Sequence, residues 1–251
     1  PPEQKDIYYL CAPSRDLAVE SPYLEVFEKS GREVVFVYSA IDDFVMANME
    51  KFQGRKLVGA EKSDINLGDD KEEDKDKGAK EKDSDEKKLS GKDADEFCAW
   101  AKTILGGKVS AVAITARLGS SPAIVTDSES GSMRRMMRMV DTQDSGGTLS
   151  AMPLGKQKVE VNPSHPVIIG MAEMRESRPA LAEAVLNQVF DNCLIAAGLL
   201  DDGRSMLPRL NDLLLCAIRG TDGGNTAASK EDKGGKEEDG GELSEEGGDK
   251  K

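Results

Sequence analysis

The sequence predicts an α/β unit followed by an α+β domain, with a charged linker between them. Three observations lead to this prediction. Strand and helix signals alternate over residues 6–60, strands and helices without regular alternation follow from residue 93, and an almost entirely charged segment separates the two regions. Regular alternation is typical of a parallel sheet with crossover helices, whereas irregular order is typical of α+β folds.

The first unit, residues 1–62, has the pattern β-α-β-α-β. Its segments in order are IYYLCA, SPYLEVFEKSG, EVVFVY, IDDFVMANMEKF and GRKLVGA. Ser21 is a suitable N-cap with Pro22 at the first helical position, and Gly31 is a natural helix stop. The apolar run Val34–Tyr38 favours a strand covered on both faces. Because about 55 residues are marginal alone, we expect this unit to be the end of a larger α/β domain in a longer protein.

Two segments are too polar to fold by themselves. Residues 63–92 are a charged linker containing DDKEEDKDKGAKEKDSDEKK, and residues 221–251 are an acidic, Gly-rich tail. Neither can bury enough apolar surface to offset its ordering entropy. We expect both to be flexible, and with such a linker the sequence does not determine whether the two folded regions hold a fixed angle.

The second domain, residues 93–220, begins with a helix that Gly106 and Gly107 end. Turn-forming residues separate the strands of a three-stranded sheet. A C-terminal group of helices follows. The expected elements are a helix at Asp93–Leu105, strands at Val109–Leu118, Ala123–Thr126 and Lys158–Val161, and helices at Pro166–Arg175, at Pro179–Leu199 and up to about Arg219.

The start of the last helix is constrained by Pro208. A proline inside a helix removes a hydrogen bond and costs about 3 kcal/mol, whereas in the first turn its missing N–H costs little. We therefore predict a late start, with Ser205 as the N-cap and Pro208 in the first turn.

The last two helices carry more apolar surface than one covered side requires, which is a stripe about 100° wide. Either they are central in their own domain or they bury the surplus against a second copy. Their place at the end of a small domain favours a helical-bundle homodimer. The candidate interface residues are Val189, Leu194, Ile195, Leu207, Leu210, Leu213, Leu214, Ala217 and Ile218.

A Met-rich basic segment, SMRRMMRMV, has helical spacing. Met133, Met136 and Met137 lie on one face, with Arg134 and Arg138 elsewhere around the helix. The segment is either an ordinary helix packed on the sheet or an adaptable binding surface, because unbranched, polarizable Met side chains fit many partners. A membrane-surface helix is a third reading, which the short length and the acidic chain disfavour.

The sequence contains none of the catalytic or cofactor-binding motifs that would indicate an enzyme. We find no phosphate loop, dinucleotide fingerprint or zinc-protease motif, and the paired carboxylates lie in solvated acidic runs. His165 is the only histidine and reads as structural. Cys11, Cys98, Cys193 and Cys216 are far apart and read as reduced core thiols. We therefore predict no catalytic residue, no cofactor site and no metal site in this chain.

Charge and hydropathy exclude two classes of partner. The net charge of −13 argues against a sequence-independent nucleic-acid binder, whose affinity comes mainly from Lys and Arg. No apolar run approaches the roughly 18 residues needed to span a bilayer, so we expect no membrane insertion.

Several separated motifs resemble the heat-shock-protein-90 chaperones in order and spacing. They are QKDIYYLCAPSRDLAVESPYLEVFEKSGREVVFVYSAIDDFVM, SSPAIVTD, VEVNPSHPVI, FDNCLIAAGLLDD and RLNDLL, which together extend from Gln4 to Arg219. EFCAWAKTILGGKV and AAGLLDD are more similar to the mitochondrial branch. The final GGDKK differs from the ending by which cytosolic members dock tetratricopeptide co-chaperones, so such docking is in doubt.

The resemblance implies that residues 1–62 are the end of the middle domain and residues 93–220 the C-terminal dimerisation domain. It implies a four-helix bundle across a homodimer, and client contact through Met133, Met136, Met137, Arg134 and Arg138. ATP and Mg would bind in an N-terminal domain outside this chain, so the parent would be an ATPase and this chain would not. The resemblance also implies a mitochondrial location, with a cytoplasmic one as the alternative.

The function predicted for this chain is therefore homodimerisation and binding of unfolded client proteins, as part of a stress-response chaperone. A passive dimerisation scaffold without client contact is one rival. The other is a hydrolase or transferase with its site in the β-α-β-α-β unit.

Overall fold

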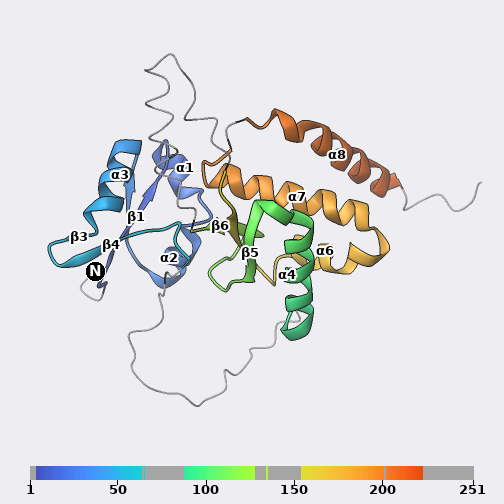
Figure 1. The fold of residues 1–251 in the computed structure, drawn as a ribbon, viewed down its shortest axis with the longest axis horizontal. Coiled ribbons are helices and arrows are strands. Elements are labelled where there is room, and N and C mark those ends of the chain that lie inside the picture. The colour runs from blue at the N-terminus through green and yellow to red at the C-terminus, as the bar shows by residue number, and fades with distance from the viewer. Residues whose placement is uncertain are drawn as a thin grey trace, which may run out of the picture. The chain divides into compact units, whose positions relative to one another are not determined.

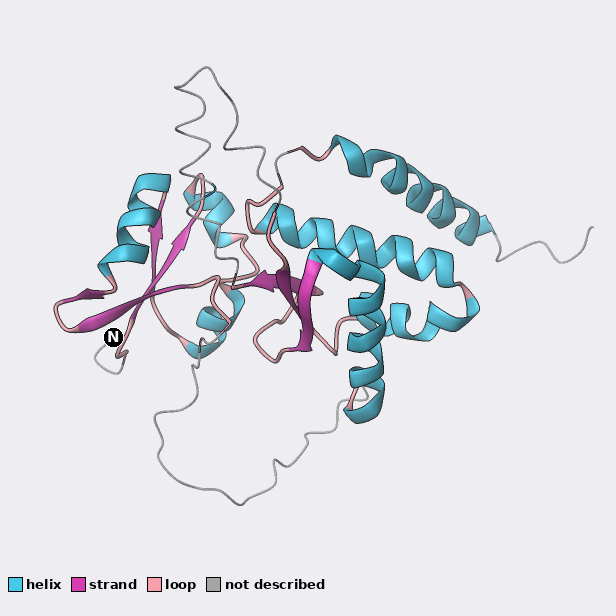
Figure 2. Ribbon diagram, in the orientation of Figure 1, coloured by secondary structure: helices cyan, strands magenta, loops and turns pink. Residues whose placement is uncertain are grey.

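The computed structural model of the chain describes residues 4–63, 65, 88–127, 134, 154–200 and 202–222 (Figure 1). The described residues up to Leu214 belong to one compact unit, and those from Leu215 belong to a second. The first unit holds two small mixed sheets, one formed before the charged segment and one after it (Figure 2). The mixed α/β character of the prediction is thus confirmed, while the domain borders at residues 62, 92 and 220 stay a prediction.

The first sheet is built around β1 (Ile7–Cys11). β2 (Val34–Val37) and β4 (Arg55–Gly59) pair with β1 in parallel, and β3 (Lys51–Phe52) pairs with β4 antiparallel. The strand order is β2-β1-β4-β3. The three predicted strands are present and parallel as expected. The short β3–β4 hairpin was not predicted, and it corrects the expected helix IDDFVMANMEKF, because Lys51 and Phe52 at the end of that segment form β3.

β2 corrects one expectation. It lies at the edge of the sheet, and Val35 is 46% exposed, so the strand is not covered on both faces. An apolar run predicts a strand, but it does not distinguish a central strand from an edge strand whose outer residues lack a cover. Here one face of β2 is open within the described chain.

Three helices connect these strands: α1 (Arg15–Val19), α2 (Glu25–Ser30) and α3 (Ala40–Met49). The short α1 was not predicted, although Ser14 caps it by accepting from the Leu17 N–H. Gly31 ends α2 in the left-handed region at φ 64°, as predicted.

The start of α2 differs from the prediction. Ser21 and Pro22 do not begin the helix; residues 21–24 form a turn in which the Leu24 N–H donates to the Ser21 carbonyl, 3.0 Å away. The turn buries Tyr23 and Leu24. Because the tertiary fold buries these two side chains, the segment forms a turn although its local sequence favours a helix start.

The second sheet contains β5 (Val109–Ile114), β6 (Ala123–Thr126) and β7 (Gln157–Val161). Its order is β5-β7-β6, with β5 parallel and β6 antiparallel to the central β7. The predicted three strands are present, but β5 ends at Ile114 instead of Leu118. The chain bends at Ala116 and Arg117, which turns the Arg117 side chain towards the first sheet.

α4 (Gly91–Leu105) precedes this sheet and ends at Gly106, where a 3₁₀ turn, η1 (Gly106–Lys108), leads into β5. α6 (Pro166–Ser177) follows β7, and α7 (Pro179–Ala196) packs against both α6 and β6. His165 caps α6, its Nδ1 accepting from the Val167 N–H at 3.1 Å. This contact gives the only histidine the structural role that the sequence predicted.

α8 (Leu207–Asp222) is preceded by a 3₁₀ turn, η2 (Arg204–Met206). The predicted late start is confirmed, because Pro208 lies in the first turn of α8. The predicted N-cap is wrong, since Ser205 lies inside η2 and the helix begins two residues later. Hydrogen bonds of the 3₁₀ turn involve backbone N–H groups that would otherwise need an N-cap side chain as acceptor.

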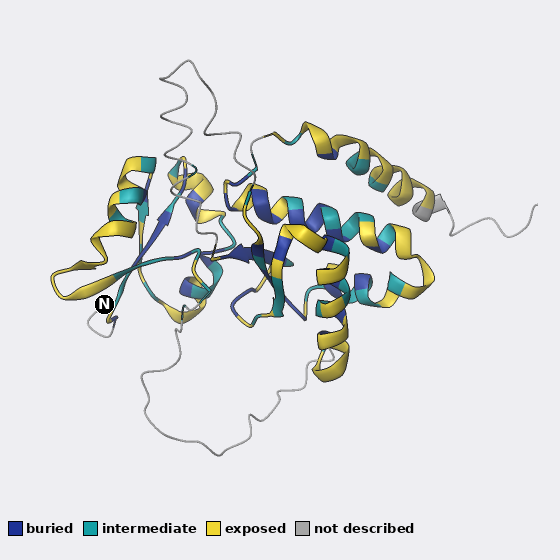
Figure 3. Ribbon diagram, in the orientation of Figure 1, coloured by how far each residue is buried: buried dark blue, intermediate teal, exposed yellow. Residues whose placement is uncertain are grey.

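One hydrophobic core extends through both sheets (Figure 3). Phe27 of α2 packs on Tyr8 of β1 with ring centroids 4.8 Å apart. The same core includes Phe97 of α4 and Ile124 of β6. The two regions that the sequence separates by a charged segment therefore bury their apolar residues together.

We predict that Phe27→Ala destabilises the protein by about 3–5 kcal/mol, because Phe27 is fully buried and truncation leaves a cavity. Phe52→Ala is the matched control, since this phenylalanine of β3 is exposed, and its effect should stay below about 1 kcal/mol. Urea unfolding of the three proteins measures both values. Equal losses for the two variants would contradict the placement of the core.

Candidate functional site

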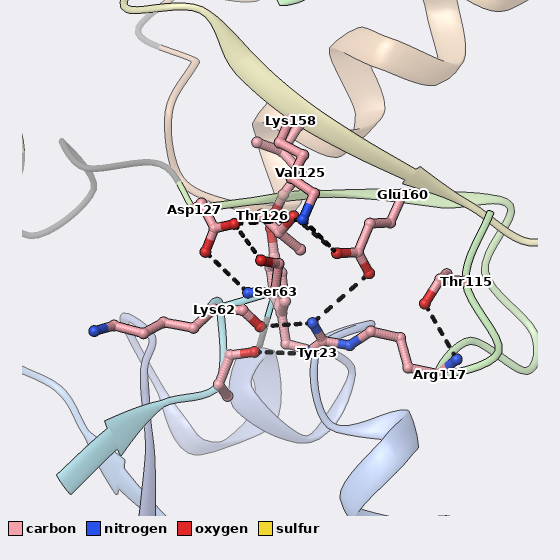
Figure 4. A network of polar contacts seen from close by, with 11 residues as sticks. Tyr23, Lys62, Ser63, Thr115, Arg117, Val125, Thr126, Asp127, Lys158 and Glu160 are labelled. Atoms are coloured by element: carbon pink, nitrogen blue, oxygen red, sulfur yellow. Dashed lines mark hydrogen bonds and ion pairs between the residues drawn. The ribbon is translucent and has the colours of Figure 1, made fainter. Parts of the chain in front are cut away.

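The most elaborate polar structure in the described chain is centred on Arg117, in the loop after β5 (Figure 4). The guanidinium donates from Nη2 to the Ala60 carbonyl at 2.9 Å and from Nη1 to the Lys62 carbonyl at 2.7 Å. Nη1 also lies 3.9 Å from Oε2 of Glu160 on β7. The side chains of this ion pair are only 8% and 7% exposed. Arg117 thus links the segment that follows β4 with the second sheet.

Glu160 and Asp127 extend these contacts along the second sheet. Thr126 donates from Oγ1 to Oε1 of Glu160 at 3.1 Å, and Nζ of Lys158 lies 3.8 Å from the same oxygen. Asp127 accepts from the Ser63 N–H at 3.0 Å and from the Ser63 hydroxyl. Its backbone has φ 53°, an uncommon conformation for a residue other than glycine. The end of β6 is therefore fastened to residue 63.

The α2 region makes a second set of bonds to the second sheet. The Tyr23 hydroxyl donates to the Val125 carbonyl at 2.5 Å. One Glu25 oxygen accepts from the N–H groups of Gly119 and Ser120, and the other accepts from the hydroxyls of Ser120 (2.9 Å) and Ser121 (2.6 Å). We call all of these contacts, from Tyr23, Glu25, Ser63, Arg117 and their partners, the polar junction.

The electrostatics of the junction favour its charged carboxylates. Burial alone would raise the pKa of Glu25, but the bonds from Ser121, Gly119 and Ser120 lower it below the ordinary value. In the same way, Ser63 and Lys158 outweigh burial and lower the pKa of Asp127. Burial lowers the pKa of Arg117, an effect that Glu160 opposes. The junction therefore holds the Glu25 and Asp127 carboxylates in their ionised forms.

The sequence did not single out the junction residues. Arg117, Glu160 and Glu25 pair over long sequence separations, and no local periodicity reports such pairs. The alternation in the strand KVEV places Glu160 on the side of Lys158 and opposite the two valines, so nothing in the sequence indicated that this carboxylate is buried.

The predicted interface residues fall into two groups. Leu207, Leu214 and Ile218 of α8 are 52%, 60% and 59% exposed. Ile195 and Ala217 are also exposed, whereas Leu210 and Leu213 are half-buried.

Val189 and Leu194 of α7 differ, because both are buried in the core of the single chain. The packing of α7 on β6 and α6 covers its inner face. The width of the apolar surface in the sequence does not show which part of it the chain covers itself. These two side chains are therefore not on the surface of one copy, and the interface itself stays a prediction.

A polar cluster fixes the first turns of α8 on α7. Arg209 donates from Nε to Oε1 of Gln188 at 3.2 Å and from Nη2 to the Asp191 carboxylate. Gln188 donates in turn to Oδ1 of Asn192 at 2.9 Å and to the Met206 sulfur at 3.5 Å. This cluster positions the exposed apolar residues of α8 that precede residue 215.

The predicted client-contact residues Met133, Met136, Met137 and Arg138 lie outside the described residues. Arg134 is described as a single helical, half-buried residue. Nothing in the described chain tests the prediction for this segment.

The described residues contain no group of three or more His, Cys, Asp or Glu side chains placed to hold a metal ion. The four cysteines are free, but only Cys193 is buried; there burial raises the thiol pKa to about 12. Cys216 is exposed on α8, which corrects the prediction that all four are core thiols. Within the same part of the chain, no helix is long and apolar enough to cross a membrane.

Comparison with known proteins gives consistent matches. A family model described as Hsp90 protein matches residues 1–246. The chain is 39% identical to a mitochondrial TNF receptor-associated protein 1 homolog of Dictyostelium discoideum, over 85% of this chain and 28% of that protein. It is 38% identical to the mitochondrial heat shock protein 75 kDa of Rattus norvegicus, over 85% and 29%. It is 36% identical to the chaperone protein HtpG of Desulfitobacterium hafniense, over 86% and 33%. The chain thus spans about a third or less of the length of these relatives.

The lowered pKa of Glu25 predicts a pH-dependent contribution to stability. Because the folded-state pKa lies below the ordinary 4.5, the stabilisation is present above that value and is lost as pH falls through the folded pKa. We expect Glu25→Gln to lose about 1 kcal/mol at pH 7, and the difference from wild type to shrink below pH 4.5. Urea unfolding at a series of pH values measures it.

Glu28→Gln is the control for this prediction, since Glu28 is an exposed residue on the same helix. It should change stability by less than about 0.5 kcal/mol at every pH. A Glu25→Gln protein as stable as wild type at pH 7 would show that the bonds to residues 119–121 contribute nothing.

Proposed function

The chain belongs to the heat-shock-protein-90 family, in its mitochondrial branch, and from that premise we propose that it is the dimerising, client-binding part of an ATP-dependent molecular chaperone. The family match over residues 1–246 is the observation that carries the proposal. Its location is mitochondrial, as for the three relatives with mitochondrial names.

The exposed apolar surface of α8 supports homodimerisation. Leu207, Leu214 and Ile218 are separated by seven and four residues, so they follow one face of the helix. Soluble proteins rarely leave a continuous apolar face uncovered, and a second copy is its most economical cover because a twofold axis pairs the same surface with itself. We assign Leu210, Leu213 and Ala217, which lie on the same helix, to the border of this face, and we keep Ile195 of α7 as a separate candidate interface residue.

Dimerisation would raise the effective concentration of the two protomers' remaining parts for each other. Once the C-terminal helices hold two copies together, contact between the remaining parts of the two protomers becomes intramolecular. ATP and Mg would bind to a part of the longer protein outside this chain, so this chain would hold the protomers together without catalysing hydrolysis. The lowered pKa values of Glu25 and Asp127 agree with a structural role for the carboxylates of the polar junction.

Client binding is assigned to Met133, Met136 and Met137 with Arg134 and Arg138. Unbranched Met side chains adapt to varied apolar surfaces, and the arginines add long-range attraction to acidic clients. The rival is a passive scaffold in which these methionines are only packed against the sheet.

We predict that the wild-type chain sediments at twice its mass of 27.0 kDa, and that Leu214→Glu and Leu210→Glu give folded monomers. A buried glutamate in an apolar interface lacks a partner and weakens association strongly. Sedimentation equilibrium over a wide concentration range measures the mass. Ile41→Glu is the matched control, because Ile41 is an equally exposed aliphatic residue on α3, and it should remain dimeric. A monomeric wild type would overturn the dimer assignment.

Replacement of Met133, Met136 and Met137 by Ser separates client contact from packing. We expect the triple variant to unfold at the wild-type temperature and to lose suppression of client aggregation, because the adaptable apolar face is gone. Light scattering of a thermally aggregating client protein, with calorimetry of the variant, measures both effects. Loss of folding would instead support the packed-helix reading.

A further inference from the structure

We propose that residues 4–63 and 88–214 form one body held together by side-chain contacts, so that the two parts stay associated when the charged segment between them is cut. The covalent connection through residues 64–87 would then not determine how the parts are coupled. The angle between the two parts, which the sequence left undetermined, is thereby assigned to the polar junction and the shared core.

Both ends of the charged segment are fastened to the region of the second sheet. Before the segment, the Lys62 carbonyl accepts from Arg117 and Ser63 binds Asp127 at the end of β6. After it, the Leu89 N–H donates to the Pro163 carbonyl at 3.0 Å, just beyond β7. The segment therefore leaves and returns on the same sheet, as an inserted loop does and as a linker between separate domains does not.

Apolar side chains in the shared core contribute to the association of the two parts. Tyr8, Leu10 and Phe27, from before the segment, belong to one cluster with residues from after it. Phe27 is fully buried, as are Phe97 and Ile124 across the junction. Separation of the parts would expose several of these apolar side chains to water, which opposes separation.

The polar contribution makes the association specific. Glu25 meets four donors supplied by Gly119, Ser120 and Ser121, and one turn further along α2 the Lys29 ammonium donates to the Leu118 carbonyl at 2.8 Å. Asn162 supports the receiving loop by donating to the carbonyls of Gly119 (3.0 Å) and Ser121 (3.2 Å). A preorganised loop that matches one carboxylate at this point holds α2 in one orientation on the second sheet.

The functional consequence rests on the proposed function. In a chaperone driven by ATP elsewhere in the longer protein, movement that reaches residues 4–63 would pass to the dimerising helices through Glu25, Tyr23 and Arg117. The association itself does not depend on that function and is measured separately.

The test inserts the recognition sequence of a site-specific protease between Lys77 and Gly78 of the full chain. The background is Leu214→Glu, so that dimerisation does not enter the result. After complete cleavage we expect both pieces to co-elute on gel filtration at about 10 μM, since a core of this kind gives micromolar or tighter affinity. Separate elution of the two pieces would overturn the proposal.

Glu25→Ala and Glu28→Ala in the cleaved protein test the role of the polar junction. Both residues lie on α2, but only Glu25 meets the loop at residues 119–121. We expect Glu25→Ala to weaken association at least about tenfold and Glu28→Ala less than about twofold. Equal affinities for the two variants would show that the core alone holds the parts. Melting curves of the uncleaved variants confirm that each is folded.

Discussion

The buried guanidinium of Arg117 is the constraint on which the rest of the structure depends. A charge that is almost completely removed from water must be paired and hydrogen-bonded, or it costs several kcal/mol. Arg117 meets this requirement with the Glu160 carboxylate and with the carbonyls of Ala60 and Lys62. The planar, multiply donating guanidinium can reach all three at once, whereas an ammonium group could not match that geometry.

This requirement explains why the two sheets form one body. Ala60 and Lys62 follow β4, so the partners of Arg117 are in place only when the first sheet is docked on the second. Glu160 is in place only when β7 has entered the second sheet. When the sheets are apart, Arg117 and the carbonyls of Ala60 and Lys62 would face water, and they become buried together with their partners only on docking, so folding of the two is expected to be cooperative. The charged segment divides the sequence without dividing the core.

Much of the fold could be predicted because its signals are local. The parallel strands β1, β2 and β4 and the helix stops at Gly31 and Gly106 follow from apolar runs and from glycine geometry. The errors arose where distant contacts decided the local structure. Ser21 has a good capping sequence, but the burial of Tyr23 and its bond to Val125 require a turn there. β5 stops early for a similar reason, because Arg117 must leave the strand to reach Ala60.

The candidate interface was also predicted only in part, because the sequence shows which residues are apolar but not which of them the tertiary packing covers. The sequence predicted that α7 and α8 carry surplus apolar surface, but it could not separate Val189, which the chain covers itself, from Leu214, which it leaves exposed. The difference depends on the packing of α7 against β6. The Arg209 cluster with Gln188 and Asp191 then fixes how α8 leaves α7. Because these polar bonds place Leu207 and Leu210 before any partner binds, less entropy would be lost in the proposed dimer, and the apolar residues could serve for affinity.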